Sequence, residues 1–266
     1  MKAMALLNGE TIVHRMAGGA ELSCIHAYAW EEHLEQVIED SGAEGGRIIR
    51  NDTASCLILW DSENVVSAWR GTKNADAFTI DSLRHMRRDW LTNLKVLFRR
   101  RTTFGPVHRG YLFEINSILN EVEAVRRPLT ESGLADWRMG HSQGGGEALI
   151  DAVLNGSRSV FRVMTFGAPR STGRRFAGAA EMAFGARHER ITLGSDPVPR
   201  MPLPLRYTHC GTHIHFFADP LNDGRTRSQQ KHGYCFDTRD EYPRGCDFSD
   251  HLDYVERTQA VLKAVQ

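Results

Sequence analysis

The second half of the chain alternates short apolar runs with amphipathic segments at a steady spacing. We predict strands over residues 136–141, 160–166 and 189–193, with helices over residues 143–154 and 173–183 between them. A strand, a helix and a second strand in this order form a right-handed crossover, which places the two strands parallel. The spacing therefore predicts an α/β fold with a mainly parallel central sheet flanked by helices.

The remaining segments extend this core without a break in composition. We predict an amphipathic helix over residues 20–38, strands over residues 47–50, 54–60 and 64–69, a helix over residues 111–125 and a closing helix over residues 250–265. No repeat, linker or low-complexity tract divides the 266 residues, of which 41% are hydrophobic. A chain of this size is expected to bury about three quarters of its unfolded surface. We therefore expect a single domain over residues 1–266.

The charge balance excludes two classes of protein. Basic residues number 33 and acidic residues number 33, so the formal net charge is zero. Proteins that bind nucleic acid usually carry an excess of basic residues, and acidic disordered tails carry charge without aromatic residues. We expect a folded protein with no nucleic-acid partner.

No segment has the pattern of a membrane span or an export signal. The longest strongly apolar run, residues 56–60, is far shorter than the roughly 20 residues that cross a bilayer. The apolar run over residues 3–7 is too short for a signal peptide. We expect a cytoplasmic protein without a transmembrane segment; export by a route that needs no signal peptide is the alternative.

The five cysteines are scattered along the chain, and their number is odd. A protein made in a reducing compartment has little use for disulfides. We expect free thiols, and a bridge between Cys235 and Cys246 is the alternative.

The sharpest local signal is the run Gly140-His141-Ser142-Gln143-Gly144, where a predicted strand gives way to a predicted helix. A G-x-S-x-G run in this context forms a nucleophile elbow, a turn so tight that the serine backbone is strained and only glycine fits on either side. The serine hydroxyl is then exposed at the edge of the sheet. We predict that Ser142 is a catalytic nucleophile; a glycine-rich loop with a structural serine is the alternative.

A serine nucleophile in this fold type needs a carboxylate and a histidine, which follow it along the chain in that order. Asp196 follows the predicted strand 189–193, and prolines fix the loop behind it. His251 opens the closing helix after a loop, so its side chain can reach the sheet edge. We predict that Asp196 is the acid and His251 the base; a turn aspartate and a helix-cap histidine are the alternatives.

Three other histidines, His209, His213 and His215, lie close together in the sequence and suggest a metal site at first sight. No carboxylate or cysteine stands at ligand spacing from them. We expect no metal ion, and the serine chemistry requires no organic cofactor.

Seven phrases resemble the class 3 (fungal-type) lipases, which have the α/β-hydrolase fold, and they appear in the family's order. They are Ala68-Trp69-Arg70-Gly71-Thr72, Asp89-Trp90-Leu91-Thr92-Asn93-Leu94, Val107-His108-Arg109-Gly110-Tyr111, the elbow at residues 140–144, Thr165-Phe166-Gly167-Ala168-Pro169-Arg170, Asp196-Pro197-Val198-Pro199 and Asp250-His251-Leu252-Asp253-Tyr254. The resemblance covers residues from about 45 to 262. It implies that the whole chain adopts the α/β-hydrolase fold.

The resemblance also implies roles for individual residues. Ser142, Asp196 and His251 would form a catalytic triad. Two donors would form an oxyanion hole, which stabilises the negative oxygen of the tetrahedral intermediate. One donor is the backbone N–H of Gln143, the residue after the nucleophile, and the other comes from Thr72.

Two features beside the predicted site concern lipid. Residues 73–88 lie where family members carry a lid, and their pattern fits a short amphipathic helix; a plain surface helix is the alternative. The basic residues Arg84, Arg87, Arg88, Lys95, Arg99, Arg100 and Arg101 lie close together in the sequence. Basic residues are attracted to anionic headgroups, so peripheral contact with an anionic lipid surface is our hypothesis for them. A solvated charged face is the alternative.

The residues and the resemblance together predict a serine hydrolase that cleaves carboxylic esters of glycerolipids, as a triacylglycerol lipase or esterase. Phospholipase A1 activity, hydrolysis of small soluble esters and a role as a lipid-degrading effector are alternatives. An alternative from another class is a non-catalytic lipase-like scaffold for partner binding, against which the intact candidate triad argues.

Overall fold

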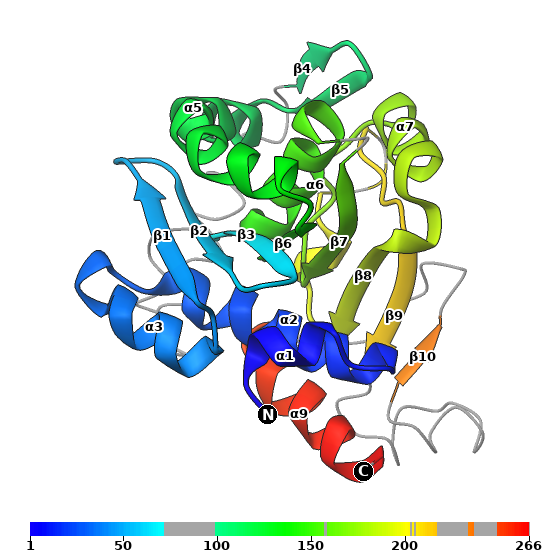
Figure 1. The fold of residues 1–266 in the computed structure, drawn as a ribbon. Coiled ribbons are helices and arrows are strands. Elements are labelled where there is room, and N and C mark those ends of the chain that lie inside the picture. The colour runs from blue at the N-terminus through cyan, green and yellow to red at the C-terminus, as the bar shows by residue number, and fades with distance from the viewer. Residues whose placement is uncertain are drawn as a thin grey trace.

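The computed structural model describes residues 1–71, 99–156, 159–202, 204, 206–216, 234–236 and 249–265 (Figure 1). For residues 234–236, 264 and 265 it describes the backbone alone. The predicted lid over residues 73–88 and the predicted oxyanion donor Thr72 lie outside the described residues. The basic residues from Arg84 to Lys95 lie outside them as well. The side chains of Cys235 and Cys246 are also not described, so the alternative of a bridge between them stays a prediction. Cys24, Cys56 and Cys210 are free thiols.

Eight strands within the described residues form one mixed sheet in the order β1-β2-β3-β6-β7-β8-β9-β10. Their bounds are β1 Gly45–Arg50, β2 Ser55–Trp60, β3 Asn64–Trp69, β6 Ala135–His141, β7 Val160–Phe166, β8 His188–Leu193, β9 Thr212–Phe216 and β10 Tyr234–Phe236. Neighbouring strands among β3, β6, β7, β8 and β9 pair in parallel. The first three strands form an antiparallel meander, and β10 pairs antiparallel with β9. The prediction of a mainly parallel α/β sheet is confirmed.

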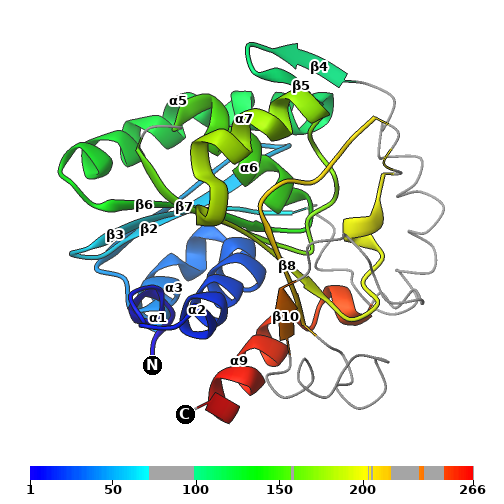
Figure 2. The same ribbon diagram turned by 90° about the vertical axis from the view of Figure 1, so that its right-hand side faces the viewer.

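Helices cover both faces of this sheet (Figure 2). One face carries α5 Arg109–Glu131, α6 Gln143–Asn155 and α7 Arg174–Phe184, and the other carries α1 Ala3–Leu7, α2 Ile12–Cys24, α3 Leu34–Ser41 and α9 Tyr254–Val265. Short 3-10 turns are η1 His26–Tyr28, η2 Glu31–His33, η4 Gly185–Arg187, η5 Val198–Arg200 and η6 Ser249–His251. A separate cluster of buried apolar side chains fills each of the two interfaces. Because both faces are covered, every residue of β3 and β8 is buried.

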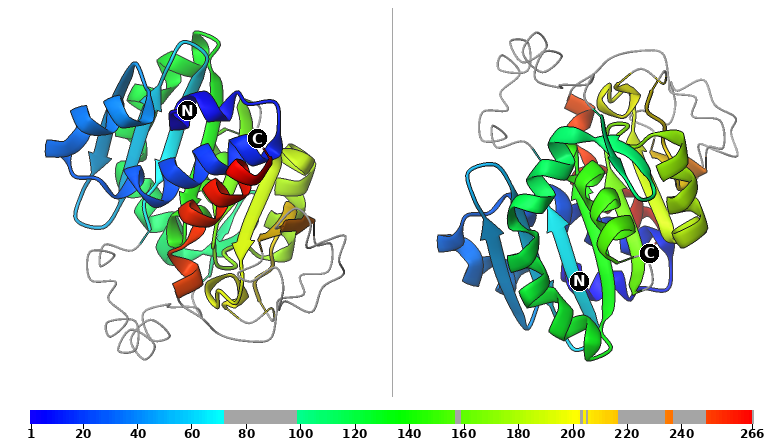
Figure 3. Two further views of the ribbon diagram at one scale, coloured as in Figure 1. Left: turned by 90° about the horizontal axis from the view of Figure 1, so that it is seen from below. Right: turned by 90° about the horizontal axis from the view of Figure 1, so that it is seen from above.

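The two ends of the chain lie on the α1/α9 face of the sheet (Figure 3). None of the described helices is long and apolar enough to cross a bilayer.

The single helix predicted over residues 20–38 is wrong. The chain instead passes from α2 to α3 through two 3-10 turns. A continuous amphipathic helix over these residues would place Ile25 and Trp30 on its apolar face, but their side chains are 51% and 43% exposed. Trp30 packs under the guanidinium of Arg50, 4.0 Å from its ring centroid, so a surface cation–π contact holds it rather than the core.

The closing helix also starts later than predicted. Its first residue is Tyr254, and His251 lies in the preceding turn η6. A tertiary contact holds this turn, since the carboxylate of Asp250 accepts a hydrogen bond from the Ser195 N–H at 2.6 Å. Local periodicity does not report such a contact.

Helix α1 and a hairpin of β4 Arg99–Thr102 and β5 Gly105–His108 had no counterpart in the prediction. The hairpin stands off the main sheet, on the α5/α7 face (Figures 1 and 2).

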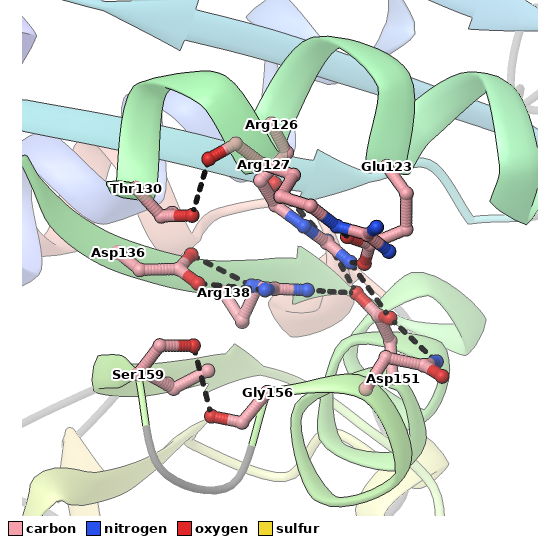
Figure 4. A network of polar contacts seen from close by, with 12 residues as sticks. Glu123, Arg126, Arg127, Thr130, Asp136, Arg138, Asp151, Gly156 and Ser159 are labelled. Carbon is pink, nitrogen blue, oxygen red and sulfur yellow. Dashed lines mark hydrogen bonds and ion pairs between the residues drawn. The ribbon is translucent and has the colours of Figure 1, made fainter. Parts of the chain in front are cut away.

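Asp151 of α6 lies at the centre of a buried ion-pair network (Figure 4). Its Oδ2 atom accepts hydrogen bonds from Arg126 Nη1 at 2.7 Å, Arg138 Nη1 at 2.5 Å and Trp69 Nε1 at 3.1 Å. Asp136 pairs with the other side of the Arg138 guanidinium at 2.6 and 2.7 Å. These residues come from β3, α5, β6 and α6, so the network fixes two helices to the centre of the sheet.

Burial raises the pKa of Asp151, but Arg126 and Arg138 outweigh burial and hold the pKa well below its usual range. Asp151→Asn should lower the free energy of unfolding by about 3 to 5 kcal/mol, because two buried guanidiniums lose their shared carboxylate. Urea unfolding would measure the change. In the wild type this stabilisation should be complete above about pH 4 and be lost as the pH falls further, since the folded-state pKa is the lower one.

Glu123→Gln is the matched control, because this carboxylate contacts the same Arg126 from a side chain that is 19% exposed. It should cost about 1 kcal/mol or less. Equal losses in the two variants would contradict the central position of Asp151.

Candidate active site

Ser142 stands at the junction of β6 and α6. Its backbone has φ 57° and ψ −129°, the one positive φ of a non-glycine residue in the described part of the chain. Such a conformation costs on the order of 1–3 kcal/mol and needs support from its surroundings. A hydrogen bond from the Ser142 N–H to the Phe166 carbonyl at 2.8 Å supplies part of it. A Cβ at Gly144 would lie 2.1 Å from the Trp69 carbonyl oxygen, so only glycine fits there.

The carboxylate of Asp196, just after β8, accepts three hydrogen bonds. Its Oδ2 atom accepts from His251 Nδ1 at 2.9 Å and from the Tyr254 hydroxyl at 2.8 Å. Its Oδ1 atom accepts from the Val198 N–H at 2.8 Å. Asp196 and His251 are 1% and 2% exposed. Because the carboxylate engages the proton on Nδ1, the Nε2 atom of His251 carries the lone pair that a general base needs.

His141 connects the elbow to His251. Its ring centroid lies 4.5 Å from that of His251, and its Nε2 donates to the His251 carbonyl at 2.8 Å. Its Nδ1 accepts a hydrogen bond from the Tyr28 hydroxyl at 3.1 Å. Burial, and then His251, holds the pKa of His141 well below its usual value, so this ring is neutral.

The structure thus places Asp196 and His251 in contact and brings Ser142 next to them through His141. No hydrogen bond joins Ser142 to His251 directly, and among the described residues the buried Nε2 atom of His251 has no partner. The catalytic roles of the three residues therefore stay predictions, of which the contact between Asp196 and His251 is the part that the geometry supports.

Tyr254 and His141 are residues to which the sequence reasoning gave no role. The Tyr254 hydroxyl accepts a hydrogen bond from the Leu193 N–H at 3.1 Å while it donates to Asp196. Burial, and then Asp196, raises the pKa of Tyr254 well above its usual value, so the phenol remains a donor. The signal was present in the sequence, because Tyr254 follows His251 by about one helical turn and His141 immediately precedes Ser142.

Gln143 is the first residue of α6, and two carboxyl groups hold its side chain. Its Nε2 donates to Glu114 Oε2 at 2.6 Å and to Glu147 Oε1 at 2.8 Å. Burial, and then Glu114, raises the pKa of Glu147 well above its usual range. These contacts fix the first turn of α6, which carries the N–H predicted for the oxyanion hole. The second predicted donor, Thr72, cannot be placed because it lies outside the described residues.

The three clustered histidines are buried or half-buried hydrogen-bond partners. His213 Nε2 and His215 Nδ1 both bond to the Thr192 hydroxyl, at 2.7 and 2.9 Å. His209 Nε2 donates to the Pro199 carbonyl at 2.7 Å. In the part of the chain that the structure describes, no three His, Cys, Asp or Glu side chains gather as they would around a metal ion.

Comparison with known proteins shows the family of the chain. The sequence model of the family "Lipase (class 3)" matches residues 66–205, more than half of the chain. The chain belongs to the class 3 lipases. The predicted family and its α/β-hydrolase fold are therefore confirmed.

The individual relatives share a low sequence identity with this chain. The chain is 30% identical over 176 residues to the secreted mono- and diacylglycerol lipase 1 of Fusarium solani, and the match covers 62% of this chain and 52% of that protein. The chain thus spans about half the length of this relative. The Rhizomucor miehei triacylglyceride lipase has a similar structure, with a TM-score of 0.69 at 18% identity over 94% of this chain and 96% of that one. Lipase II from Rhizopus niveus has a TM-score of 0.65 at 19% identity over 91% and 94%.

The prediction of a cytoplasmic location is wrong. The Fusarium solani relative is a secreted protein, which points to secretion. The prediction depended on the absence of a signal-peptide pattern in the first residues, and the secreted relative outweighs that absence.

Gly167, directly after β7, lies against the Asp196–His251 pair with φ 59°. A Cβ there would lie 2.9 Å from Asp196 Oδ2 and 3.0 Å from His251 Nδ1. Gly167→Ala should therefore displace both groups and lower kcat on a soluble p-nitrophenyl ester by about 100-fold, as a shift of the order of 1 Å can do.

Gly178→Ala is the matched control, because a Cβ at this exposed position of α7 meets nothing within 4 Å. It should leave kcat unchanged and stabilise the protein by about 0.5–1 kcal/mol. Equal activity of the two variants would contradict the placement of the site.

Proposed function

We propose that the protein is a carboxylic ester hydrolase that acts on acylglycerols through Ser142, His251 and Asp196. The observation that carries the proposal is the hydrogen bond of 2.9 Å between the buried Asp196 and His251, next to the strained elbow of Ser142. An aspartate that holds a histidine in this way leaves the far nitrogen free to act as a base.

In the first half of the reaction Ser142 Oγ attacks the ester carbonyl carbon, and His251 Nε2 takes the hydroxyl proton. The tetrahedral intermediate collapses, the bond to the alcohol oxygen breaks, and the imidazolium returns the proton to the departing alcohol. Water then attacks the acyl-enzyme with His251 as base, which releases the fatty acid and restores Ser142. The carboxylate of Asp196 stabilises the imidazolium.

Two further groups support these steps in the proposal. The backbone N–H of Gln143 stabilises the negative oxygen of the intermediate, and Thr72 is the predicted second donor. Tyr254 keeps the carboxylate of Asp196 in line with His251, because its hydroxyl donates at 2.8 Å to the same oxygen.

The Fusarium solani relative suggests a substrate class for this chain. That protein is a mono- and diacylglycerol lipase, so we propose partial acylglycerols as substrates of this chain. We further propose one domain over residues 1–266, a lid over residues 73–88, and peripheral contact with an anionic lipid surface. The resemblance to the family and the basic residues support the last two.

Ser142→Ala should lower ester hydrolysis by about 10⁴-fold or more, because the nucleophile is lost while the fold persists. Release of p-nitrophenol from a short-chain ester would measure the loss. Ser23→Ala is the matched control, since this serine is fully buried and its hydroxyl has no partner among the described residues. A wild type without activity on esters of any chain length would favour the non-catalytic scaffold instead.

A lid over residues 73–88 should make the rate depend on a lipid surface. On a series of esters of increasing chain length, the rate should jump once the substrate exceeds its solubility limit and forms an interface. Smooth saturation on soluble esters, with no further rise at the interface, would indicate an esterase without a lid.

A further inference from the structure

Five exposed arginines from three separate segments line one cleft on the α5/α7 side of the molecule. Two adjoining cavities of about 540 Å³ and 380 Å³ share Arg99, Pro106, Arg175 and Arg206 in their walls. Arg101 lines the first cavity, and Arg174 lines the second. We call Arg99, Arg101, Arg174, Arg175 and Arg206 the arginine cleft.

Within the described residues, nothing compensates the charge of the arginine cleft. Among the residues that the structure describes, no acidic side chain lines either cavity and none of the five guanidiniums forms an ion pair. The buried Arg126 and Arg138, in contrast, share the carboxylate of Asp151. Like charges held together without counter-charges repel one another, so the cleft favours an anion from outside.

The position of Arg174 and Arg175 strengthens this argument. They are the first two residues of α7, whose first turn contains no acidic residue. The partial positive charge of a helix N-terminus disfavours cations there, so these arginines do not serve the stability of the helix. An anion in the cleft would meet both the guanidiniums and the start of the helix.

Tyr207 provides a second, independent observation. It lines the smaller cavity, is 1% exposed, and its hydroxyl has no hydrogen-bond partner in the part of the chain that the structure describes. A buried hydroxyl without a partner is costly unless a ligand or water satisfies it. Arg99 Nη1 donates to the Arg206 carbonyl at 3.3 Å, which ties the hairpin to the segment that carries this tyrosine.

The hairpin gives the cleft the character of a lipid-facing surface. Phe104, in the turn between β4 and β5, is 37% exposed, and Arg100 and Arg101 beside it are exposed as well. An exposed aromatic ring next to arginines is typical of segments at the boundary between headgroups and acyl chains. A site for a small soluble anion has no need of such a ring.

We propose that the arginine cleft binds the phosphate of an anionic phospholipid headgroup and docks the protein on a lipid surface through the β4–β5 hairpin. Guanidinium forks match phosphate oxygens in pairs, which a diffuse positive surface does not. The proposal gives the proposed ester hydrolase a surface on which to act, but the binding itself does not require Ser142.

Binding should be measured by vesicle co-sedimentation in the Ser142→Ala background, so that hydrolysis does not alter the vesicles. Vesicles of phosphatidylcholine with phosphatidic acid should bind the protein, and vesicles of phosphatidylcholine alone should not. Arg174→Gln/Arg175→Gln should weaken binding by about 25-fold, at about fivefold for each charge near the surface. The substitution should not lower the melting temperature, since it removes cations from a helix N-terminus.

Arg47→Gln/Arg127→Gln is the matched control, because it removes the same charge from exposed positions on β1 and near the far end of α5. It should leave binding within about twofold, since neither residue lies at the docking surface. Equal losses in the two double variants would overturn the proposal.

Two further arms identify the ligand. Arg174→Lys/Arg175→Lys keeps the charge and loses the forks, so full affinity in this variant would overturn specific phosphate recognition. Saturable binding of inorganic phosphate, without vesicle binding, would assign the cleft to a free anion and overturn lipid docking. Because none of these measurements uses turnover, a failure here is distinct from a failure of the proposed hydrolase.

Discussion

The buried carboxylate of Asp196 is the contact on which the rest of the site depends. It receives hydrogen bonds from its own turn, from the 3-10 turn of His251 and from the first residue of α9. An ionised carboxylate out of water is tolerated only when its oxygens are satisfied. The segment from residue 249 to residue 265 must therefore pack in place for the end of β8 to keep its form. Since α9 packs on α2, the candidate site at the sheet edge is coupled to the N-terminal helices.

Asp151 is a second buried carboxylate, and it holds the elbow of Ser142 in place. The strain at Ser142 persists only if the strand before it and the helix after it cannot relax. Asp151 of α6 and Arg138 of β6 are joined at 2.5 Å, which ties the helix and the strand on either side of the serine to one another. The side chain of Gln143, held between two carboxyl groups, fixes the turn between them. The contacts that stabilise the fold thus also hold the candidate nucleophile in place.

Much of this arrangement could be predicted from the sequence, for identifiable reasons. Each segment from β6 to β8 keeps a single period, and Ser142 and Asp196 stand where strands end, while His251 stands just before the closing helix. The helix predicted over residues 20–38 failed because periodicity cannot tell that Ile25 and Trp30 face water. The bond between Tyr254 and Asp196 joins residues 58 positions apart, and spacing does not say which tyrosine reaches which carboxylate. Sequence reasoning found only Arg99 and Arg101 of the arginine cleft, because Arg174, Arg175 and Arg206 come from two other segments.

The position of the two chain ends has a practical consequence. Both lie on the α1/α9 face of the sheet, whereas the β4–β5 hairpin and α7 lie on the opposite side (Figures 2 and 3). A support attached through an affinity tag at either end would therefore hold the molecule with its arginines turned toward the solution. Immobilised in this way, the protein could capture vesicles from a flowing sample without its attachment covering the surface that meets them.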